Sequence, residues 1–102
     1  MNNNLFKAIA DPTRREIITL IIENDSPTLN QVSSNFKMSR QAVTKHINIL
    51  ENVGLVTVEK IGREKHCNVN PKPLKEVYDW IKNYKEFWED KLSSLEKYLD
   101  ES

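Results

Sequence analysis

The sequence is poor in cysteine, in glycine and in long apolar runs: its 102 residues include one cysteine and two glycines. A single cysteine cannot form a disulfide within the chain, so we expect a reducing, cytoplasmic location. The longest near-continuous apolar run, residues 17–22, is far shorter than the roughly 18 to 20 residues of a membrane helix, and residues 1–4 do not resemble a secretion signal. We therefore expect a soluble protein that stays inside the cell and has no membrane partner.

Motifs for catalysis are also missing. The sequence shows no glycine-rich phosphate loop, no ordered serine, histidine and aspartate set and no pair of carboxylates with catalytic spacing. A chain of this length buries only about two-thirds of the surface of its unfolded state, so it can build a modest core but not a deep active site. We expect one domain over residues 1–102 that is not an enzyme and needs no cofactor.

Charge is balanced over the whole chain but not along it. The 15 basic and 15 acidic side chains divide unequally: residues 1–73 have a basic excess and residues 74–102 an acidic excess. The basic excess is greatest within residues 37–73. Such a segment is compatible with a nucleic-acid-binding face, although an excess of this size also occurs on ordinary solvated surfaces.

Helix caps and glycines divide the chain into elements. Asp11 followed by proline is typical of a helix start, and Thr28 with Gln31 has the pattern of a capping box. Gly54 suits a left-handed helix end, and Gly62 lies between two strand-like runs and suits a hairpin turn. The expected elements are helices over about residues 3–9, 12–24, 29–35, 40–53 and 71–100, and strands over 55–60 and 65–69.

The order of these elements predicts a winged helix-turn-helix. Two short helices joined by about four residues form the outline of a helix-turn-helix, and the hairpin over residues 55–69 would be the wing. The expected fold class is mainly α with a β-hairpin wing (α+β), in the order α-α-α-α-β-β-α, with a long C-terminal helix. The helix over 12–24 is apolar nearly all round, which predicts a central buried helix.

The helix over residues 39–53 has two different faces. Val43, Ile47 and Leu50 cluster on one side of a helical wheel and predict the core face. The opposite side carries groups that can hydrogen bond to base edges or phosphates. His46 lies beside the core face and fits either a packed, hydrogen-bonded side chain or a DNA contact. The predicted DNA-binding residues are Ser39, Arg40, Gln41, Thr44, Lys45, His46 and Asn48 of this helix, and Arg63 and Lys65 of the wing.

Three stretches resemble the ArsR-type winged-helix transcriptional repressors: residues 10–15 (ADPTRR), 42–47 (AVTKHI) and 53–56 (VGLV). The resemblance covers essentially the whole chain. It implies a homodimeric DNA-binding repressor whose helix over 39–53 reads the DNA, with the family's Ser/Thr-x-His pattern at Thr44 and His46. The last segment, residues 84–92, is similar to a subgroup that has a long C-terminal helix and no known metal motif.

The chain departs from the family pattern in its metal ligands and in one turn. Metal-sensing members have cysteines on the third helix or histidines on the last, and residues 29–33 and 71–102 have neither. A thiolate site needs several soft ligands, and the adjacent His66 and Cys67 should point to opposite faces of a strand, so we expect no metal site. Lys37 lies in the turn where glycine is frequent, which predicts a left-handed residue there at a cost of about 1 kcal/mol.

Apolar residues of the last helix recur at heptad spacing. Leu74, Ile81, Trp88 and Leu95 are seven residues apart, and a helix over 74–99 would be roughly 39 Å long, too long for this domain to cover. The stripe either folds back onto the chain's own core or forms a homodimer interface, which we prefer because Trp and Tyr suit interface cores. The predicted interface residues are Leu5, Phe6, Val77, Ile81, Tyr84, Trp88, Leu92 and Leu95.

These inferences lead to one principal hypothesis and one alternative. The principal hypothesis is a homodimeric repressor that binds an inverted repeat in double-stranded DNA, because a two-fold axis presents two reading helices to half-sites about 34 Å apart. The alternative is a winged-helix module that docks a partner protein through its C-terminal helix. Release by an unknown small-molecule inducer, or by oxidation of Cys67, would add to the first hypothesis, although packing is the preferred role of Cys67.

Overall fold

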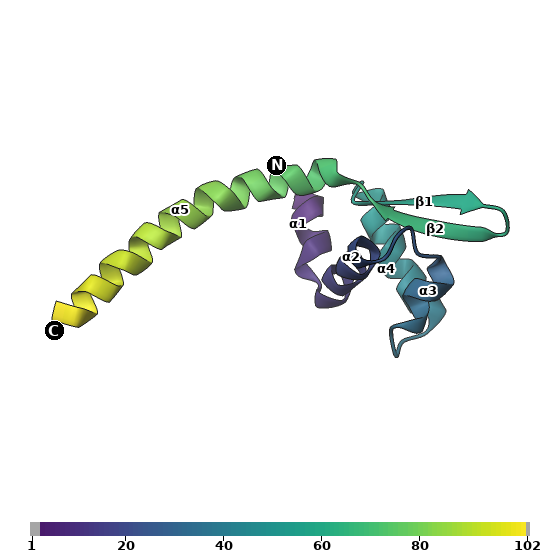
Figure 1. Ribbon diagram of the computed structural model, residues 1–102, viewed down its shortest axis with the longest axis horizontal. Coiled ribbons are helices and arrows are strands. Elements are labelled where there is room, and N and C mark those ends of the chain that lie inside the picture. Colours follow the sequence, from purple (N-terminus) through teal and green to yellow (C-terminus); the bar gives the residue numbers. More distant parts are fainter. Residues whose placement is uncertain (1–2, 102) are drawn as a thin grey trace.

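The computed structural model describes residues 3–101 (Figure 1). The predicted order and type of the elements are confirmed, and every boundary lies within one residue of its expected place. The fold is a winged helix-turn-helix with a long C-terminal helix. In chain order the elements are α1 (Asn3–Ala10), α2 (Pro12–Glu23), α3 (Leu29–Ser34), α4 (Arg40–Asn52), β1 (Val56–Ile61), β2 (Glu64–Val69) and α5 (Pro71–Glu101).

The corner between α1 and α2 is closed by two arginines. Asp11 caps α2 as predicted, since its carboxylate accepts a hydrogen bond from the backbone N–H of Arg14 at 3.1 Å. The last four carbonyls of an α-helix have no partner within the helix. In α1 the guanidinium of Arg14 donates to the first two of these carbonyls and that of Arg15 to the last two. The acceptors are Lys7, Ala8, Ile9 and Ala10, at 3.1, 2.7, 2.9 and 2.8 Å.

The helix pair α3 and α4 begins at the predicted caps. Thr28 Oγ1 accepts from the backbone N–H of Gln31 at 3.1 Å, and the Thr28 N–H donates to Gln31 Oε1 at 2.8 Å, which completes the capping box. Ser39 caps α4 through its hydroxyl, which accepts a backbone N–H at 3.1 Å. Local hydrogen bonds therefore determine where both helices start.

The turn between α3 and α4 differs from the prediction, because Lys37 does not have a positive φ. Asn35 ends α3 in a right-handed conformation, and its side-chain amide donates to the Gln31 carbonyl at 2.8 Å. That helix end is therefore satisfied without a left-handed residue. Positive φ values occur instead at Ser26 (46°), before α3, and at Gly54 (81°), which ends α4 as predicted.

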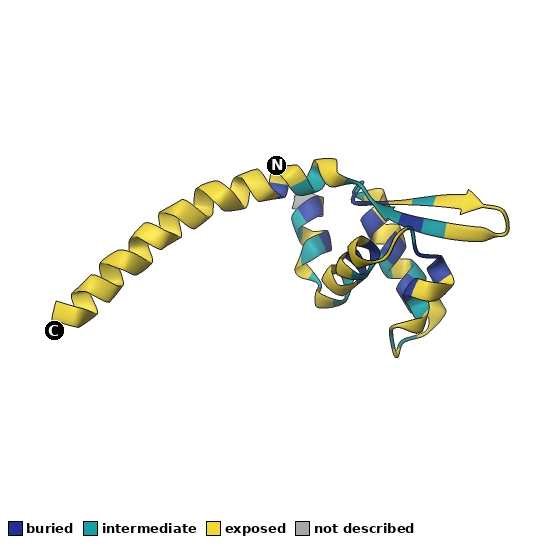
Figure 2. Ribbon diagram, in the orientation of Figure 1, coloured by how far each residue is buried: buried dark blue, intermediate teal, exposed yellow. Residues whose placement is uncertain are grey.

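The hydrophobic core lies between α1, α2, α3, α4 and the base of the hairpin (Figure 2). The predicted core face of α4 is confirmed, since Val43, Ile47 and Leu50 are buried. α2 is more one-sided than predicted: Ile22 is 62% exposed, because it lies beyond the edge of the face that packs on the core. The fully inaccessible side chains are those of Ile17, Val32, Val43, Leu50, Leu55 and Cys67.

The hairpin is attached at its base to the loop before α3. β1 and β2 are antiparallel, with residue 56 opposite 69 and residue 61 opposite 64, and Gly62 takes a positive φ in the turn. The Cys67 N–H donates to the Pro27 carbonyl at 2.8 Å, and His66 Nδ1 lies 2.7 Å from the Ser26 carbonyl oxygen. These contacts fix the direction in which the wing leaves the core.

α5 extends far beyond the rest of the molecule (Figures 1 and 2). Its 31 residues correspond to about 47 Å, and the chain has a radius of gyration of 17.9 Å, against about 13 Å for a compact chain of this length. Val77 is buried against the core, whereas residues 78–101 are all exposed. Residues 3–77 are termed the head below, and residues 78–101 the tail. No helix within residues 3–101 is both long and apolar enough to cross a bilayer.

Candidate nucleic-acid interface

The face of α4 opposite the core is open to solvent. Arg40, Gln41, Lys45 and Asn48 are exposed, and Thr44 is half-buried at the edge of the same face. Their positions follow from helix periodicity, since the core-facing residues of α4 occupy the other side. The structure therefore brings these five predicted residues together on one surface.

The hairpin forms the second wall of a groove along α4. Thr44 and Asn48 line this groove from α4, and Lys60 and Lys65 line it from the two strands. Lys60 was not in the predicted set, although it lies close to the predicted wing tip. The groove therefore brings side chains of α4 close to cations of the wing.

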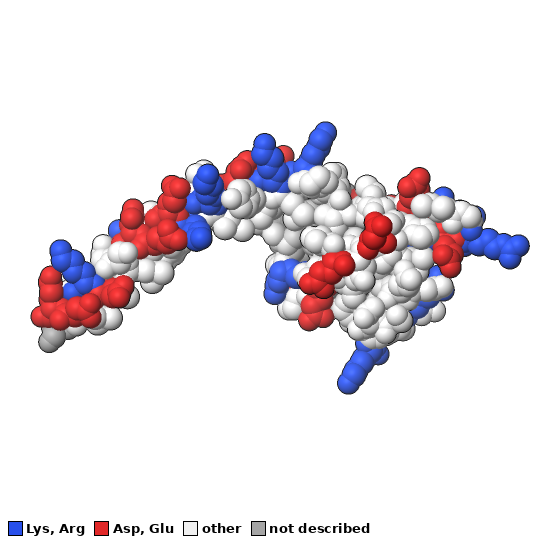
Figure 3. All heavy atoms as spheres, in the orientation of Figure 1, with Lys and Arg blue, Asp and Glu red and all other residues white. Residues whose placement is uncertain are grey.

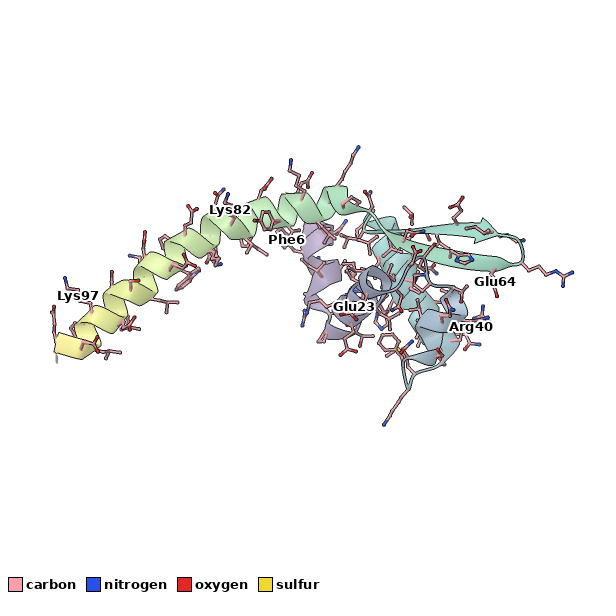
Figure 4. The ribbon with its side chains drawn as sticks, in the orientation of Figure 1. Phe6, Glu23, Arg40, Glu64, Lys82 and Lys97 are labelled. Atoms are coloured by element: carbon pink, nitrogen blue, oxygen red, sulfur yellow. The ribbon has the colours of Figure 1, made fainter. Side chains whose placement is uncertain are left out.

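A second cleft continues this groove toward the start of α4. Arg40 and Arg63 both line this cleft, together with Lys65, which also lines the first groove. Figure 4 shows Arg40 and Glu64 on the same side of the head. Asn30, in the first turn of α3, is a further lining residue that sequence reasoning missed. The only feature of the sequence that pointed to Asn30 was its position two residues after the Thr28 cap.

Cations outnumber anions around these two connected clefts. A basic side chain also projects from the tip of the hairpin into solvent (Figure 3). Positive charge on both walls suits a polyanion such as the phosphate backbone of DNA. The basic lining residues are Arg40, Lys60, Arg63 and Lys65, and the acidic ones are Glu51 and Glu64.

His46 has a partner inside the chain. It is half-buried, and its Nδ1 lies 3.3 Å from Nη1 of Arg14. This contact places His46 on the side of α4 that faces the α1–α2 corner, away from the open face. Of the two interpretations of His46, the geometry supports the packed, hydrogen-bonded side chain.

Arg14 is the central residue of this corner, and sequence reasoning gave it no role. Its side chain is only 15% exposed and lies 3.9 Å from the Asp11 carboxylate. The backbone N–H of Arg14 lowers the pKa of Asp11 below its ordinary value, burial opposes this shift, and the charge of Arg14 adds to it. Arg14 thus connects α1, the cap of α2 and His46 of α4. In the sequence, Arg14 stood out only as part of the ADPTRR stretch of residues 10–15, and the spacing of the residues in that stretch did not reveal these contacts.

Cys67 is fully buried at the base of the hairpin. Burial raises the pKa of its thiol, and the charge of Glu51 acts in the same direction. A buried thiol with a raised pKa is a poor nucleophile, which favours the packing role over redox sensing. Within residues 3–101, no three His, Cys, Asp or Glu side chains lie together where they could hold a metal ion.

The predicted interface residues divide between the core and the surface. Leu5 and Val77 are 2% and 6% exposed, because α1 and the start of α5 bury them in the head, so they offer little area to another chain. Phe6 is half-buried and makes an edge contact with Trp80 of α5, with ring centroids 5.4 Å apart. The other five form an exposed stripe along the tail and are Ile81, Tyr84, Trp88, Leu92 and Leu95.

Comparisons with known sequences agree with this geometry. A family model described as a helix-turn-helix domain matches residues 9–59, from the end of α1 into β1. The transcriptional repressor SdpR of Bacillus subtilis is 32% identical over 82 residues, which cover 80% of this chain and 90% of SdpR. The matched segments contain both the helix pair and the start of the wing.

Solved structures share the fold. An ArsR family transcriptional regulator determined by crystallography has a TM-score of 0.74 at 32% identity, over 85% of this chain and 89% of its own. A winged helix-turn-helix DNA-binding domain from Mycobacterium bovis, described as homodimeric, has a TM-score of 0.66 at 14% identity, over 81% and 76%. The second likeness concerns the fold alone.

Proposed function

Because the chain belongs to the ArsR-type family of winged helix-turn-helix transcriptional regulators, we propose that it is a homodimeric repressor that binds an inverted repeat in double-stranded DNA. In this proposal α4 enters the major groove, and the wing lies along the phosphate backbone. Arg40, Gln41, Thr44, Lys45 and Asn48 contact the groove, and Ser39, Arg63 and Lys65 contact the backbone.

One observation carries this proposal: Arg40 and Arg63 line the same cleft although they belong to α4 and to the wing. A duplex lying along the open face of α4 would therefore also meet the cations of the hairpin. Base-edge contacts give sequence preference, and phosphate contacts give register and salt-dependent affinity. The arrangement supplies side chains for both tasks on one side of the molecule.

A second copy of the chain is the proposed partner of the tail. The stripe carries three large aromatic or aliphatic side chains, Ile81, Tyr84 and Trp88, that are nearly half exposed. Contiguous exposed apolar surface of this kind is typical of interaction sites, and Trp and Tyr are enriched at interfaces. The homodimeric state described for the M. bovis domain supports this part of the proposal, and the repressor name of SdpR supports the proposed role in repression.

A selection experiment tests the proposal directly. Purified protein would be titrated against randomised duplex DNA over several rounds at two salt concentrations. We expect enrichment of an inverted repeat, with affinity that falls steeply as salt rises. The selected operator then supplies the assay in which a small-molecule inducer is sought. Failure to enrich any sequence, with only weak binding that salt abolishes, would contradict the proposal.

Two substitutions separate base reading from backbone binding. We expect Gln41→Ala to relax the preference at one operator position, at a cost of about 1–3 kcal/mol, and Arg63→Ala to weaken specific and random duplexes equally. Lys97→Ala, which removes a cation from the far end of the tail, is the matched control and should change neither. Equal losses on both duplexes for Gln41→Ala would contradict the assigned roles.

The exposed tail also favours a second candidate, a module that docks a partner protein without binding DNA. Exchange of Arg40, Lys45 and Arg63 for glutamine distinguishes the two, because the second candidate does not need the basic face. Loss of repression in cells supports the first proposal, provided that the variant remains folded. Unchanged activity of the variant supports the docking module.

A further inference from the structure

One flank of α5 changes sign along its length. Five charged residues on this flank are separated by steps of seven, three, four and seven residues, so they follow one line along the helix. The first three are basic and the last two are acidic. This line is termed the charged flank and consists of Lys75, Lys82, Lys85, Glu89 and Glu96.

The charged flank borders the exposed apolar stripe. Ile81 of the stripe and Lys82, Lys85 and Glu89 of the flank line one shallow groove, with Glu86 at its outer edge. Lys85 Nζ lies 3.7 Å from Glu89 Oε1, at the point where the flank changes from basic to acidic. A helix that covered the stripe would therefore lie against this sequence of charges.

The opposite flank of the stripe is aromatic. Trp80 and Tyr84 stack with ring centroids 5.0 Å apart, and Tyr84 and Phe87 follow at 6.2 Å. Lys91 lies over the Phe87 ring, 5.5 Å from its centroid. The two flanks of the stripe thus differ in chemistry, so the direction of a second helix decides which flanks meet.

In an antiparallel pair of identical helices each flank meets its own copy, whereas in a parallel pair the two different flanks meet. With a two-fold axis near residue 87, Lys85 of one chain would lie opposite Glu89 of the other. Glu96 would lie between Lys75 and Lys82. A parallel pair would instead place the charged flank against the aromatic one and leave its charges without complements.

We propose that the charged flank selects the dimer partner, because its order of charges fits a second, antiparallel copy of this chain and not a helix with another order. The inference rests on the proposed homodimer and adds the determinant of its direction, register and specificity. Complementary charge order favours one partner, and like charges placed opposite each other act against others. The apolar stripe supplies affinity, and the flank supplies selectivity.

Charge reversal in two separate variants tests the inference. The variant Lys82→Glu/Lys85→Glu makes the flank largely acidic, and Glu89→Lys/Glu96→Lys makes it basic. We expect each alone to self-associate roughly tenfold or more weakly than wild type in sedimentation equilibrium, since several exposed ion pairs become repulsive. An equimolar mixture should form a heterodimer about as stable as the wild-type dimer.

The outer face of α5 supplies matched controls. Lys72→Glu/Lys97→Glu and Asp79→Lys/Asp90→Lys make the same changes in net charge away from the flank, and both should associate like wild type. If the reversal variants also associate like wild type, the flank does not select the partner, although the homodimer stands. If wild type is monomeric at all concentrations, the proposed homodimer fails as well.

Zero-length cross-linking tests the direction. A carbodiimide joins a lysine amine to a carboxyl group as an amide, with loss of water. Lys75 and Glu96 are 21 residues apart, about 32 Å along one helix, so a link between them joins two antiparallel chains. Mass spectrometry of mixed, isotope-labelled and unlabelled protein should show this link. Interchain links from Lys75 to Glu76 or Asp79 in its place would indicate a parallel pair and overturn the inference.

Discussion

The head and the tail contain similar apolar residues but differ in what covers them. In the head, side chains such as Leu50 and Ile17 are inaccessible, whereas the tail leaves Trp88 and Leu92 about half exposed. In proteins most of the stability of a helix comes from packing of its apolar face and not from the intrinsic helix propensity of its residues. The head therefore has its source of stability within one chain, whereas in the proposed homodimer the tail takes its stability from association, which depends on concentration.

Removal of a core side chain should have the largest effect, because it destabilises the head. We expect Leu50→Ala to lower the free energy of unfolding by about 2–5 kcal/mol, because it leaves a cavity in a fully buried site. Urea unfolding followed by circular dichroism at one low protein concentration measures it. Leu92→Ala deletes the same atoms from the tail and should change only the dependence of stability on concentration. Equal losses at low concentration would remove the distinction between the two regions.

Trp88→Ala should weaken association while leaving the head intact. Truncation of a central interface aromatic costs about 2 kcal/mol or more of binding free energy, so the dissociation constant should rise by more than tenfold. Sedimentation equilibrium measures this change, and Asp90→Ala on the outer face of α5 is the control. An unchanged dissociation constant for Trp88→Ala would show that the stripe is not the interface.

Arg14→Ala should loosen the α1–α2 corner. The substitution leaves two α1 carbonyls and His46 without their guanidinium partner, and such losses cost about 1–3 kcal/mol of unfolding free energy. Arg15→Ala removes the same number of carbonyl contacts from a more exposed position and should cost less. Thermal unfolding of both variants makes the comparison. A greater loss for Arg15→Ala would contradict the central role of Arg14.

The smallest effect should come from the charge of Asp11. Because its pKa is lower in the folded chain than its ordinary 3.8, the carboxylate stabilises the fold above about pH 4, and this contribution is lost as the pH falls through the folded value. Asp11→Asn keeps a capping side chain but does not titrate. The stability difference between wild type and Asp11→Asn, less than about 1 kcal/mol, should therefore shrink below pH 4. A difference that is constant from pH 3 to pH 7 would exclude this linkage.

Local signals in the sequence predicted the elements well, because caps and glycines act over one turn of chain. Asp11, Thr28 and Ser39 form the hydrogen bonds that their positions suggest, and Gly54 takes the expected left-handed conformation. The prediction for Lys37 was wrong because the end of α3 is satisfied by side-chain and backbone bonds that do not require a positive φ. Turn geometry is more sensitive to such individual hydrogen bonds than helix periodicity is.

Contacts between distant segments were less predictable. The helical wheel found the open face of α4, since periodicity alone separates it from the core. The contribution of Asn30 to the cleft depends on where the hairpin leaves the core, which the loop contacts of His66 and Cys67 determine. The heptad pattern likewise did not distinguish Val77, which the head itself buries, from Ile81 four residues later, which remains exposed.

The proposed surfaces for DNA and for a second copy of the chain lie on separate elements and consist mostly of exposed side chains. Gln41 on α4 and Lys82 on α5 are both solvent-exposed, so substitutions there change stability little, within about 0.5 kcal/mol. After duplication of the gene, mutations could therefore alter the operator that one copy binds, or the partner that the other copy selects, without loss of the fold. After a few charge reversals, two descendants of one ancestral regulator could act in the same cell without forming mixed dimers.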